Sequence, residues 1–378
     1  MKKKIIFITG TRADYGKIKK VIKTLSLSKL FNVHIFVTGM HLLKIYGLTK
    51  NIILKENSKF AKIFLSKNQS YEESLDLILA NTIKSFSRYL KKKTPDMIIV
   101  HGDRAETLAA VIASSFNNYL TCHIEGGEIT GTIDEHIRHS VTKLSHLHFV
   151  SNTLAKKNLL RMGENPKNVF IVGSPEVDLM KSKNLPSLAE VKKRYEINFD
   201  KFCILIFHPV TSNLVNLKKE IQIIISAIKK TKKNYVIISP NNDPGSNIII
   251  KHYKKLKNNK KIKNFESMRF EYFLTLLKNS ELILGNSSSG VREAPVYGVP
   301  SINIGNRQNQ RVKNLNTNVV HIETITEKIL IKKINFLAGK KFTRKKIFGD
   351  GNSSNKILNI LKKDNIWKIP IQKTFHND

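Results

Sequence analysis

The sequence is poor in the features that mark secreted and membrane-spanning proteins. Its 378 residues include 2 cysteines and 1 tryptophan. Cys122 and Cys203 each lie in an apolar run; they cannot build a disulfide framework, and they fit a reducing compartment. No uncharged apolar run reaches the roughly 18 residues of a transmembrane helix. The run behind the basic start is shorter than the roughly 7–15 residues of a secretory signal. We therefore expect a soluble, cytoplasmic protein without a membrane partner.

Acidic residues are also scarce: 29 Asp and Glu stand against 65 Lys and Arg, which gives a formal net charge of +36. Such an excess invites a nucleic-acid interpretation. The basic residues are scattered along the chain, however, and no zinc-finger spacing or aromatic RNA-binding pattern accompanies them. Charge alone supplies only sequence-independent attraction, so nucleic acid is not the expected partner. The positive field instead favours a small anionic substrate.

Short β-branched runs alternate with longer helical patterns in the first half of the chain. The pattern predicts helices near 71–92, 105–117, 133–145 and 153–162. It predicts strands at 5–9, 33–39, 96–102, 120–126, 147–152 and 169–175. Continuously apolar strands that alternate with helices indicate a parallel sheet covered on both faces.

The alternation then restarts, with strands predicted at 203–210, 235–240, 281–286 and 301–306 and helices near 214–231, 270–279 and 290–298. We expect an α/β protein of two Rossmann-like domains, residues 1–173 and residues 174–352, with a hinge around 174–188. A last helix within 353–378, capped by Ser353 or Ser354, is expected to pack back on the N-terminal domain.

Polar clusters follow the predicted strands, where open α/β sheets carry their functional loops. In TGTRADYGK (9–17), Gly10 permits a tight turn, and the cations Arg12 and Lys17 are expected to face a ligand. The loop lacks the dinucleotide and P-loop glycine patterns, and its alternative interpretation is a solvated loop. In HGDRAET (101–107), a histidine, an aspartate and an arginine stand at one strand end, which favours a catalytic role; Asp103 is either a helix cap or a catalytic carboxylate.

The densest cluster is HIEGGEITGTIDEHIRH, residues 123–139. Glu125 ends a strand, and Asp134 and Arg138 share one face of the next helix, as do Glu135 and His139. Surface salt bridges are one alternative. A metal site is another, although the HExxH pattern is missing; its ligands would be His123, His136 and His139. Carboxylates from two adjacent elements with a nearby histidine suit acid–base chemistry on a sugar better, so no metal is predicted.

Three further clusters follow strands of the second half. His208 lies in FHPVT (207–211), and Asn241 and Asn242 lie in SPNNDPGSN (239–247). In GNSSSGVREAP (285–295) small hydroxyl residues stand where a helix is predicted to begin, so its backbone N–H groups and dipole would hold a diphosphate. Glu293 would accept the ribose hydroxyls, and Arg307 would contact phosphate. An ordinary serine-capped helix is the alternative.

Together these motifs, with RFEYF (269–273) and YGVPSINIGNRQ (297–308), resemble the hydrolysing UDP-N-acetylglucosamine 2-epimerases of bacterial sialic-acid pathways. The resemblance implies two Rossmann-like lobes of the GT-B type facing across a cleft, the first catalytic and the second nucleotide-binding. It implies no metal or cofactor, and a homodimer or homotetramer. The implied reaction converts UDP-N-acetylglucosamine and water into N-acetylmannosamine and UDP through 2-acetamidoglucal.

The resemblance also assigns roles to matching positions. Asp103, Glu125 and Asp134 match the family's catalytic carboxylates, His208 matches its acid–base histidine, and Arg138 matches an arginine of the same helix. The positions that match UDP or substrate contacts are Arg12, Arg104, Asn241, Ser287, Ser288, Glu293 and Arg307.

Three departures from the non-hydrolysing relatives favour the hydrolysing branch. Those relatives carry GTRPE where this chain has GTRAD, a GHRRE-like loop in place of FHPVT, and Glu in place of Asp134. Relatives that act on a diacetamido-trideoxyglucose linked to UDP or GDP remain an alternative. A GT-B glycosyltransferase that uses the same diphosphate site is the second alternative, and a nucleic-acid binder is the third.

Overall fold

The computed structural model describes residues 2–66, 74–130, 133–210, 213–241, 243–313 and 318–376. It divides into two compact units. Unit 1 comprises Met1–Glu128, Asp134–Ser182 and Ile347–Asp378, and unit 2 comprises Ile129–Ile133 and Lys183–Lys346. The division therefore falls after Ser182 and before Ile347, whereas the sequence suggested boundaries at 173/174 and 352/353. Helix α7 (Pro175–Met180) accounts for the first difference, because it packs against α1 (Arg12–Ser26) of unit 1.

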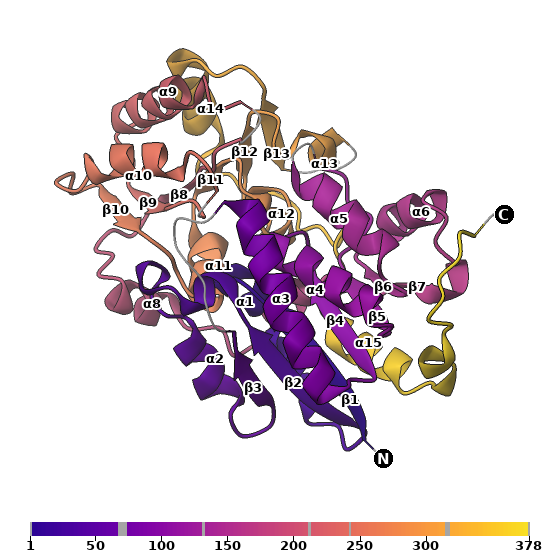
Figure 1. The fold of residues 1–378 in the computed structure, drawn as a ribbon. Helices are drawn as coiled ribbons and strands as arrows, with labels where there is room; N and C mark the ends of the chain where they lie inside the picture. Colours follow the sequence, from indigo (N-terminus) through magenta and orange to yellow (C-terminus); the bar gives the residue numbers. More distant parts are fainter. Residues whose placement is uncertain are drawn as a thin grey trace. The chain divides into compact units, whose positions relative to one another are not determined.

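Unit 1 is built on a seven-stranded sheet in the order β3-β2-β1-β4-β5-β6-β7, and its paired strands are parallel. Its strands are β1 (Lys3–Thr9), β2 (Phe31–Val37), β3 (Lys62–Leu65), β4 (Met97–His101), β5 (Thr121–Ile124), β6 (Leu147–Val150) and β7 (Val169–Ile171). Its helices include α2 (Lys50–Asn57), α3 (Leu75–Lys93), α4 (Ala105–Phe116), α5 (Ile133–Lys143), α6 (Thr153–Arg161) and α15 (Ser353–Leu361) (Figure 1). The strand order reverses between β1 and β4, which is where such sheets place their ligands.

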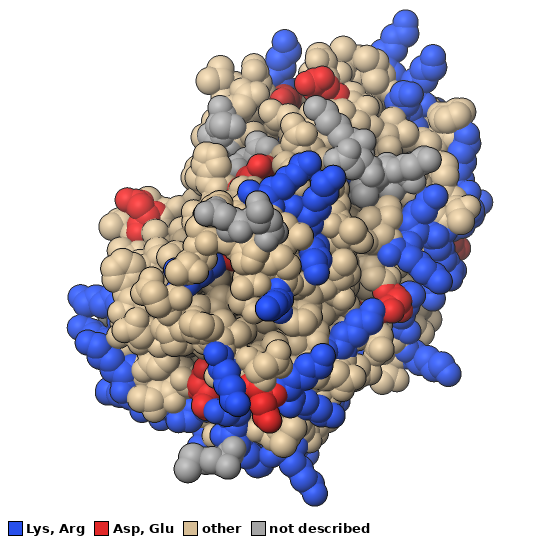
Figure 2. All heavy atoms as spheres, turned by 90° about the vertical axis from the view of Figure 1, so that its right-hand side faces the viewer, with Lys and Arg blue, Asp and Glu red and all other residues tan. Residues whose placement is uncertain are grey.

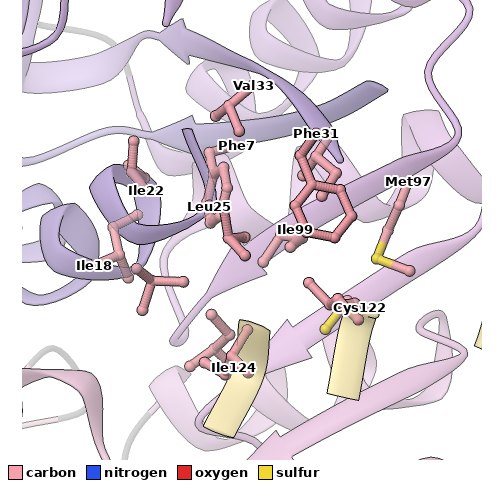
Figure 3. Close-up of a cluster of buried hydrophobic side chains, with 14 of the residues drawn as sticks. Phe7, Ile18, Ile22, Leu25, Phe31, Val33, Met97, Ile99, Cys122 and Ile124 are labelled. Atoms are coloured by element: carbon pink, nitrogen blue, oxygen red, sulfur yellow. The ribbon is translucent and has the colours of Figure 1, made fainter. Parts of the chain in front are cut away.

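Strand β1 shows why both faces of this sheet are covered. Successive side chains of a strand point to opposite faces, and Ile5 and Phe7 join the core on the α1 side, whereas Ile6 and Ile8 join the core with Phe86 of α3. Figure 3 shows the first of these cores, with Phe7 beside the α1 residues. A strand buried on both faces reads as a continuous apolar run, and this made β1 predictable.

Unit 2 is built on a six-stranded sheet in the order β10-β9-β8-β11-β12-β13, again with parallel pairs. Its strands are β8 (Cys203–Ile206), β9 (Tyr235–Ile238), β10 (Ile262–Phe265), β11 (Leu282–Gly285), β12 (Ser301–Ile304) and β13 (Val319–Ile322). Its helices are α8 (Leu188–Arg194), α9 (Leu217–Lys230), α10 (Ser246–Lys254), α11 (Phe270–Asn279), α12 (Glu293–Tyr297), α13 (Asn309–Lys313) and α14 (Glu327–Leu337). Here the order reverses between β8 and β11. The predicted fold class is confirmed: two parallel-sheet α/β domains.

The helix expected near 290–298 is present as the short α12, and the 3-10 turn η4 (Ser288–Gly290) precedes it, so the helix does not begin at the serines. Pro295 explains the break between the turn and the helix, because proline has no N–H and its ring clashes with the carbonyl four residues earlier.

The prediction for the cap of α15 was wrong. Neither Ser353 nor Ser354 is its N-cap; Asn352 holds that position without a side-chain hydrogen bond. Instead the backbone N–H groups of Ser353 and Ser354 each donate to the Asp178 carboxylate of α7, at 2.7 Å. A carboxylate at the first turn satisfies donors that a helix leaves open. Helix α15 also packs on α1 and α7, so the last helix does return to unit 1.

The basic side chains are spread widely over the face shown in Figure 2, as their scatter along the sequence suggests, and Asp and Glu are few there. No helix in the described ranges is both long enough and apolar enough to cross a membrane.

Candidate active site

A buried histidine between two carboxylates lies at the strand-order reversal of unit 1. His101, the last residue of β4, has its Nδ1 2.8 Å from Asp14 Oδ1 and its Nε2 3.3 Å from Glu125 Oε2. Burial alone would lower the pKa of His101, but Glu125 and Asp14 outweigh it and raise the pKa to about 10. His101 is therefore a cation at neutral pH. Thr9 Oγ1 donates to Asp14 Oδ2 at 2.7 Å and helps to fix that carboxylate.

Glu125 reaches this histidine from a backbone conformation that side chains rarely adopt. Its φ is 69°, in the left-handed region, which costs a non-glycine residue about 1–3 kcal/mol. The next residue must be small, because a Cβ on Gly126 would lie 2.9 Å from His123 Nδ1. The Glu125 N–H is held by Phe149 O of β6 at 2.9 Å. A strained position supported in this way is typical of functional sites.

A second buried ion pair joins α5 to the loop after β4. Arg138 is 1% exposed, and its Nη2 donates to the Asp103 carboxylate, while its Nη1 donates to Glu128 O at 2.8 Å. Burial lowers the pKa of Arg138, but the carboxylates, led by Asp103 and including Asp134, raise it above the ordinary arginine value. The structure thus gathers Asp103, Asp134 and Arg138, and it leaves Asp103 partly accessible, with a quarter of its side chain (25%) exposed.

His123 connects the two clusters and is engaged in hydrogen bonds. Its Nε2 is 3.0 Å from Gly102 O and its Nδ1 is 3.1 Å from Thr142 Oγ1. The pKa of His123 is lowered to about 3, mainly by burial; His148 lowers it further, and Arg138 and His101 make smaller contributions in the same direction. His123 therefore lies within the field of both clusters and supports the β4 loop as a neutral ring.

The alternative of a metal site at His123, His136 and His139 has no support among the described residues. His139 Nε2 is 3.5 Å from Glu135 Oε1, which is the helix-face pair expected from the sequence. Within the described ranges, no group of three or more His, Cys, Asp or Glu residues is arranged to hold a metal ion.

The basic residues predicted for ligand contact in unit 1 lie around the same loops. Arg12 opens α1 directly after its N-cap Thr11. Arg104 Nε is 3.9 Å from Glu106 Oε2, and Lys17 Nζ is 3.7 Å from Glu176 Oε1. Glu176 is almost fully buried in α7, so Lys17 has a clear structural partner, which the sequence did not indicate.

In unit 2, Asn286 fixes the backbone of His208. Asn286 Oδ1 accepts from His208 N at 2.7 Å, and Asn286 Nδ2 donates to His208 O at 2.8 Å. Arg307 Nη1 donates to Asn286 O at 3.2 Å. Gly285 must be glycine here, because its φ is 128° and a Cβ would stand 1.8 Å from Ile206 O. The ends of β8 and β11 are thereby joined at the strand-order reversal.

The serines of unit 2 form a turn rather than a long helix start. Ser287 Oγ accepts from Ser289 N at 3.3 Å and caps η4, which begins at Ser288. Glu293, the first residue of α12, is 1% exposed. Asn241 O accepts from Ser246 Oγ at 2.5 Å. Asn242, and Thr211 of the FHPVT motif, lie outside the described residues.

Sequence reasoning missed Asp14 and Asn286, and it noted the histidine of HGDRAET, His101, without assigning it a role. Asp14 and His101 stand inside motifs that were recognised, TGTRADYGK and HGDRAET, and a signal for their contact existed. These motifs follow the two strands that flank the expected reversal in strand order, so their polar side chains should converge. Asn286 lies in GNSSSG, where its amide was indistinguishable from that of an ordinary loop residue.

These features define a class of protein: a two-domain α/β protein of the GT-B type with buried charged clusters at a sheet edge. Within this class, the chain belongs to the UDP-N-acetylglucosamine 2-epimerase family, whose model matches residues 23–362. The predicted family is confirmed.

Known proteins with extended similarity include two bacterial enzymes. The chain is 39% identical over 376 residues to the UDP-N-acetylglucosamine 2-epimerase of Neisseria meningitidis serogroup B, covering 99% of this chain and 98% of that one. It is 34% identical to the UDP-N,N'-diacetylbacillosamine 2-epimerase (hydrolyzing) of Legionella pneumophila, covering 96% of both. The crystal structure of Methanocaldococcus jannaschii UDP-GlcNAc 2-epimerase with UDP-GlcNAc and UDP has a TM-score of 0.78 and 25% identity, over 95% of this chain and 99% of that one.

Proposed function

We propose that this protein is a hydrolysing 2-epimerase that converts UDP-N-acetylglucosamine and water into N-acetylmannosamine and UDP. The observation that carries the proposal is the pair of charged clusters at one sheet edge, Asp14–His101–Glu125 and Asp103–Arg138. Loss and return of the C2 proton require carboxylates that are held ionised in fixed positions. The buried cations provide this: His101 for Glu125 and Arg138 for Asp103.

The chemistry consists of an elimination and an addition. A carboxylate of the cluster removes the C2 proton, the electrons of that bond form the C1–C2 double bond, and the C1–O bond breaks to release UDP. Water then adds its oxygen to C1 of the 2-acetamidoglucal, and C2 receives a proton from the other face, which inverts it. We assign the C2 proton transfers to Glu125 and Asp103, with Asp134 and Arg138 maintaining the local charge. His208, held through Asn286, is assigned to acid–base transfer at oxygen.

Nucleotide binding is assigned mainly to the loops of unit 2. Arg307 would contact phosphate, the η4 turn offers hydroxyl and backbone donors, and Glu293 would accept ribose hydroxyls. The cations of unit 1 would complement the diphosphate charge. The residues assigned to UDP are Arg12, Arg104, Asn241, Ser287, Ser288, Glu293 and Arg307, and Lys17 is assigned a supporting charge.

The Legionella relative supports a second candidate substrate, UDP-N,N'-diacetylbacillosamine. The higher identity to the Neisseria enzyme favours UDP-N-acetylglucosamine. The two substrates share the diphosphate and the 2-acetamido group and differ at sugar C4 and C6, so the same acid–base cluster serves either one.

Proton NMR of the reaction in D2O tests the proposal. The full-length protein is incubated with UDP-N-acetylglucosamine, and free N-acetylmannosamine with deuterium at C2 should appear together with UDP. UDP-N-acetylmannosamine as the product would refute the hydrolytic step. If only UDP-N,N'-diacetylbacillosamine turns over, the second candidate replaces the first.

Variants test the assigned roles. Asp103→Asn and Glu125→Gln should each lower turnover by about 100- to 10,000-fold, the range for a lost acid–base group, with UDP affinity near wild type. Glu135→Gln is the matched control, because Glu135 pairs with His139 on the same helix and has no assigned role. Glu293→Ala should weaken UDP binding instead, and unchanged binding would remove the ribose assignment.

A further inference from the structure

Unit 1 contains a cavity of about 530 Å³ that lies apart from the loops described above. It lies between the edge strand β3 and the helix α3, both visible in Figure 1, and its lining includes Phe64, Lys84, Arg88, Tyr89, Lys92 and Lys93. At its far end Lys4 Nζ donates to Lys93 O at 2.5 Å, which places that end beside the start of β1. The active-site loops follow the opposite, carboxyl ends of the strands. Nothing in the epimerase chemistry uses this cavity.

One wall of the cavity is aromatic and rigid. The residue Phe64 is 38% exposed, and its ring stacks on that of Phe36, with ring centroids 5.4 Å apart. Tyr89 lies 4.4 Å from Phe64, centroid to centroid, and its hydroxyl is 3.1 Å from His34 Nδ1. Because these neighbours are themselves buried, the exposed face of Phe64 is held as a platform on which a planar ring can stack.

The other wall carries positive charge. Lys84, Arg88 and Lys92 follow one another every four residues along α3, so they lie on one side of the helix. Like charges at this spacing repel each other, and among the described residues no acidic side chain pairs with any of the three. Other lysines add positive charge nearby: burial first, and then Lys62, Lys4 and Lys93, lower the pKa of His34 to about 4. An anion in the cavity would relieve this repulsion.

We propose that this cavity binds a nucleotide, with the base stacked on Phe64 and the phosphates contacted by Lys84, Arg88 and Lys92. Its volume lies within the roughly 300–1,000 Å³ typical of small-molecule pockets. Aromatic stacking combined with cations is the chemistry that recognises a base linked to phosphate. A single strand of nucleic acid would need a groove that follows several phosphates, and a cavity of this size favours one nucleotide. The proposal is independent of the epimerase assignment.

Hydrogen–deuterium exchange of the full chain with ADP as the probe locates binding directly. Titration with millimolar ADP should protect peptides that cover 60–66 and 81–93. Arg88→Glu should raise the ADP concentration that gives half-maximal protection about tenfold or more, because it reverses a charge beside the phosphates. Lys91→Glu is the matched control: it makes the same charge change on the same helix, outside the cavity lining, and should retain the protection.

A second probe separates stacking from charge. Inorganic pyrophosphate should protect the same peptides more weakly than ADP, and Phe64→Leu should reduce protection by ADP but not by pyrophosphate. Thermal unfolding of each variant shows that it is folded. The proposal is overturned if ADP protects neither peptide, or if pyrophosphate equals ADP. It is also overturned if Lys91→Glu is as damaging as Arg88→Glu, and tighter binding of oligothymidylate through these residues would replace it with a strand-binding site.

Discussion

The buried cation at His101 makes a testable prediction about stability as a function of pH. The pKa of His101 is about 10 in the folded protein, against an ordinary value of 6.5. Its folded pKa is the higher one, so its contribution to stability is fully present below pH 6.5 and is lost as pH rises towards 10. Each pH unit in this window removes up to about 1.4 kcal/mol, so between pH 7 and pH 9 the loss is about 3 kcal/mol. This is a large part of the roughly 5–15 kcal/mol that stabilises a typical domain.

Urea unfolding followed by tryptophan fluorescence measures this loss in unit 1. Trp367 is the single tryptophan of the chain, and its ring lies 6.0 Å from that of Phe31, centroid to centroid. Other groups titrate between pH 7 and pH 9, so wild type is compared with His101→Gln, in which an uncharged amide that does not titrate replaces the imidazole. The difference in unfolding free energy between wild type and His101→Gln should be larger at pH 7 and should be about 3 kcal/mol smaller at pH 9. A gap that stays constant would mean that His101 is neutral in the folded protein, and the charged cluster would then be refuted.

Three further predictions concern supporting residues. Asn286→Ala removes both hydrogen bonds to the His208 backbone, so turnover should fall and unfolding free energy should drop by about 2 kcal/mol, as measured by steady-state kinetics and urea titration. Asp178→Asn leaves one backbone N–H of α15 without its acceptor, and should cost about 1–2 kcal/mol in the Trp367 assay with activity retained at low temperature. The pKa of His123 is lowered to about 3, so its contribution to the unfolding free energy is present above pH 6.5 and is lost as pH falls. Between pH 7 and pH 5, urea titrations should show a larger loss of unfolding free energy for wild type than for His123→Asn.

The fold was largely predictable because buried parallel strands read as continuous apolar runs. Three strands were not predicted, namely β3, β10 and β13, and each is an edge strand of its sheet. Edge strands are exposed on one side and carry polar residues, as Lys62 in β3 and Lys263 in β10 show. Their pattern therefore does not separate them from loops.

The candidate site was predictable as a set of loops but not as a set of contacts. Residues such as Asp103 and Glu125 follow strands, and strand ends are visible in a sequence. The contact between Glu125 and His101 cannot be read from the sequence. The same histidine ring also contacts Asp14, which is 87 residues away along the chain. The cap of α15 by Asp178 is a contact of the same kind, across 175 residues. Local propensity cannot report such pairs, since they are consequences of the sheet order.

The buried charges of unit 1 are difficult to explain by stability alone. Replacing a buried ion pair with well-packed apolar residues is often neutral or stabilising by about 1–4 kcal/mol. Arg138 with Asp103 is nevertheless present, as is His101 between Asp14 and Glu125. The left-handed conformation of Glu125 adds a further cost of about 1–3 kcal/mol. These features meet around the loops after β4 and β5, which Asp14 reaches from α1 and Arg138 from α5. The loops lie beside the strand-order reversal, where a ligand of such a sheet binds. Unit 1 has another buried charged cluster, in which Glu164 contacts His148 of β6, Lys143 and Lys373, so buried charge alone does not mark the site. The coincidence of buried charge with a strained backbone at Glu125, beside the strand-order reversal, supports the proposal that this edge is shaped by chemistry on a substrate.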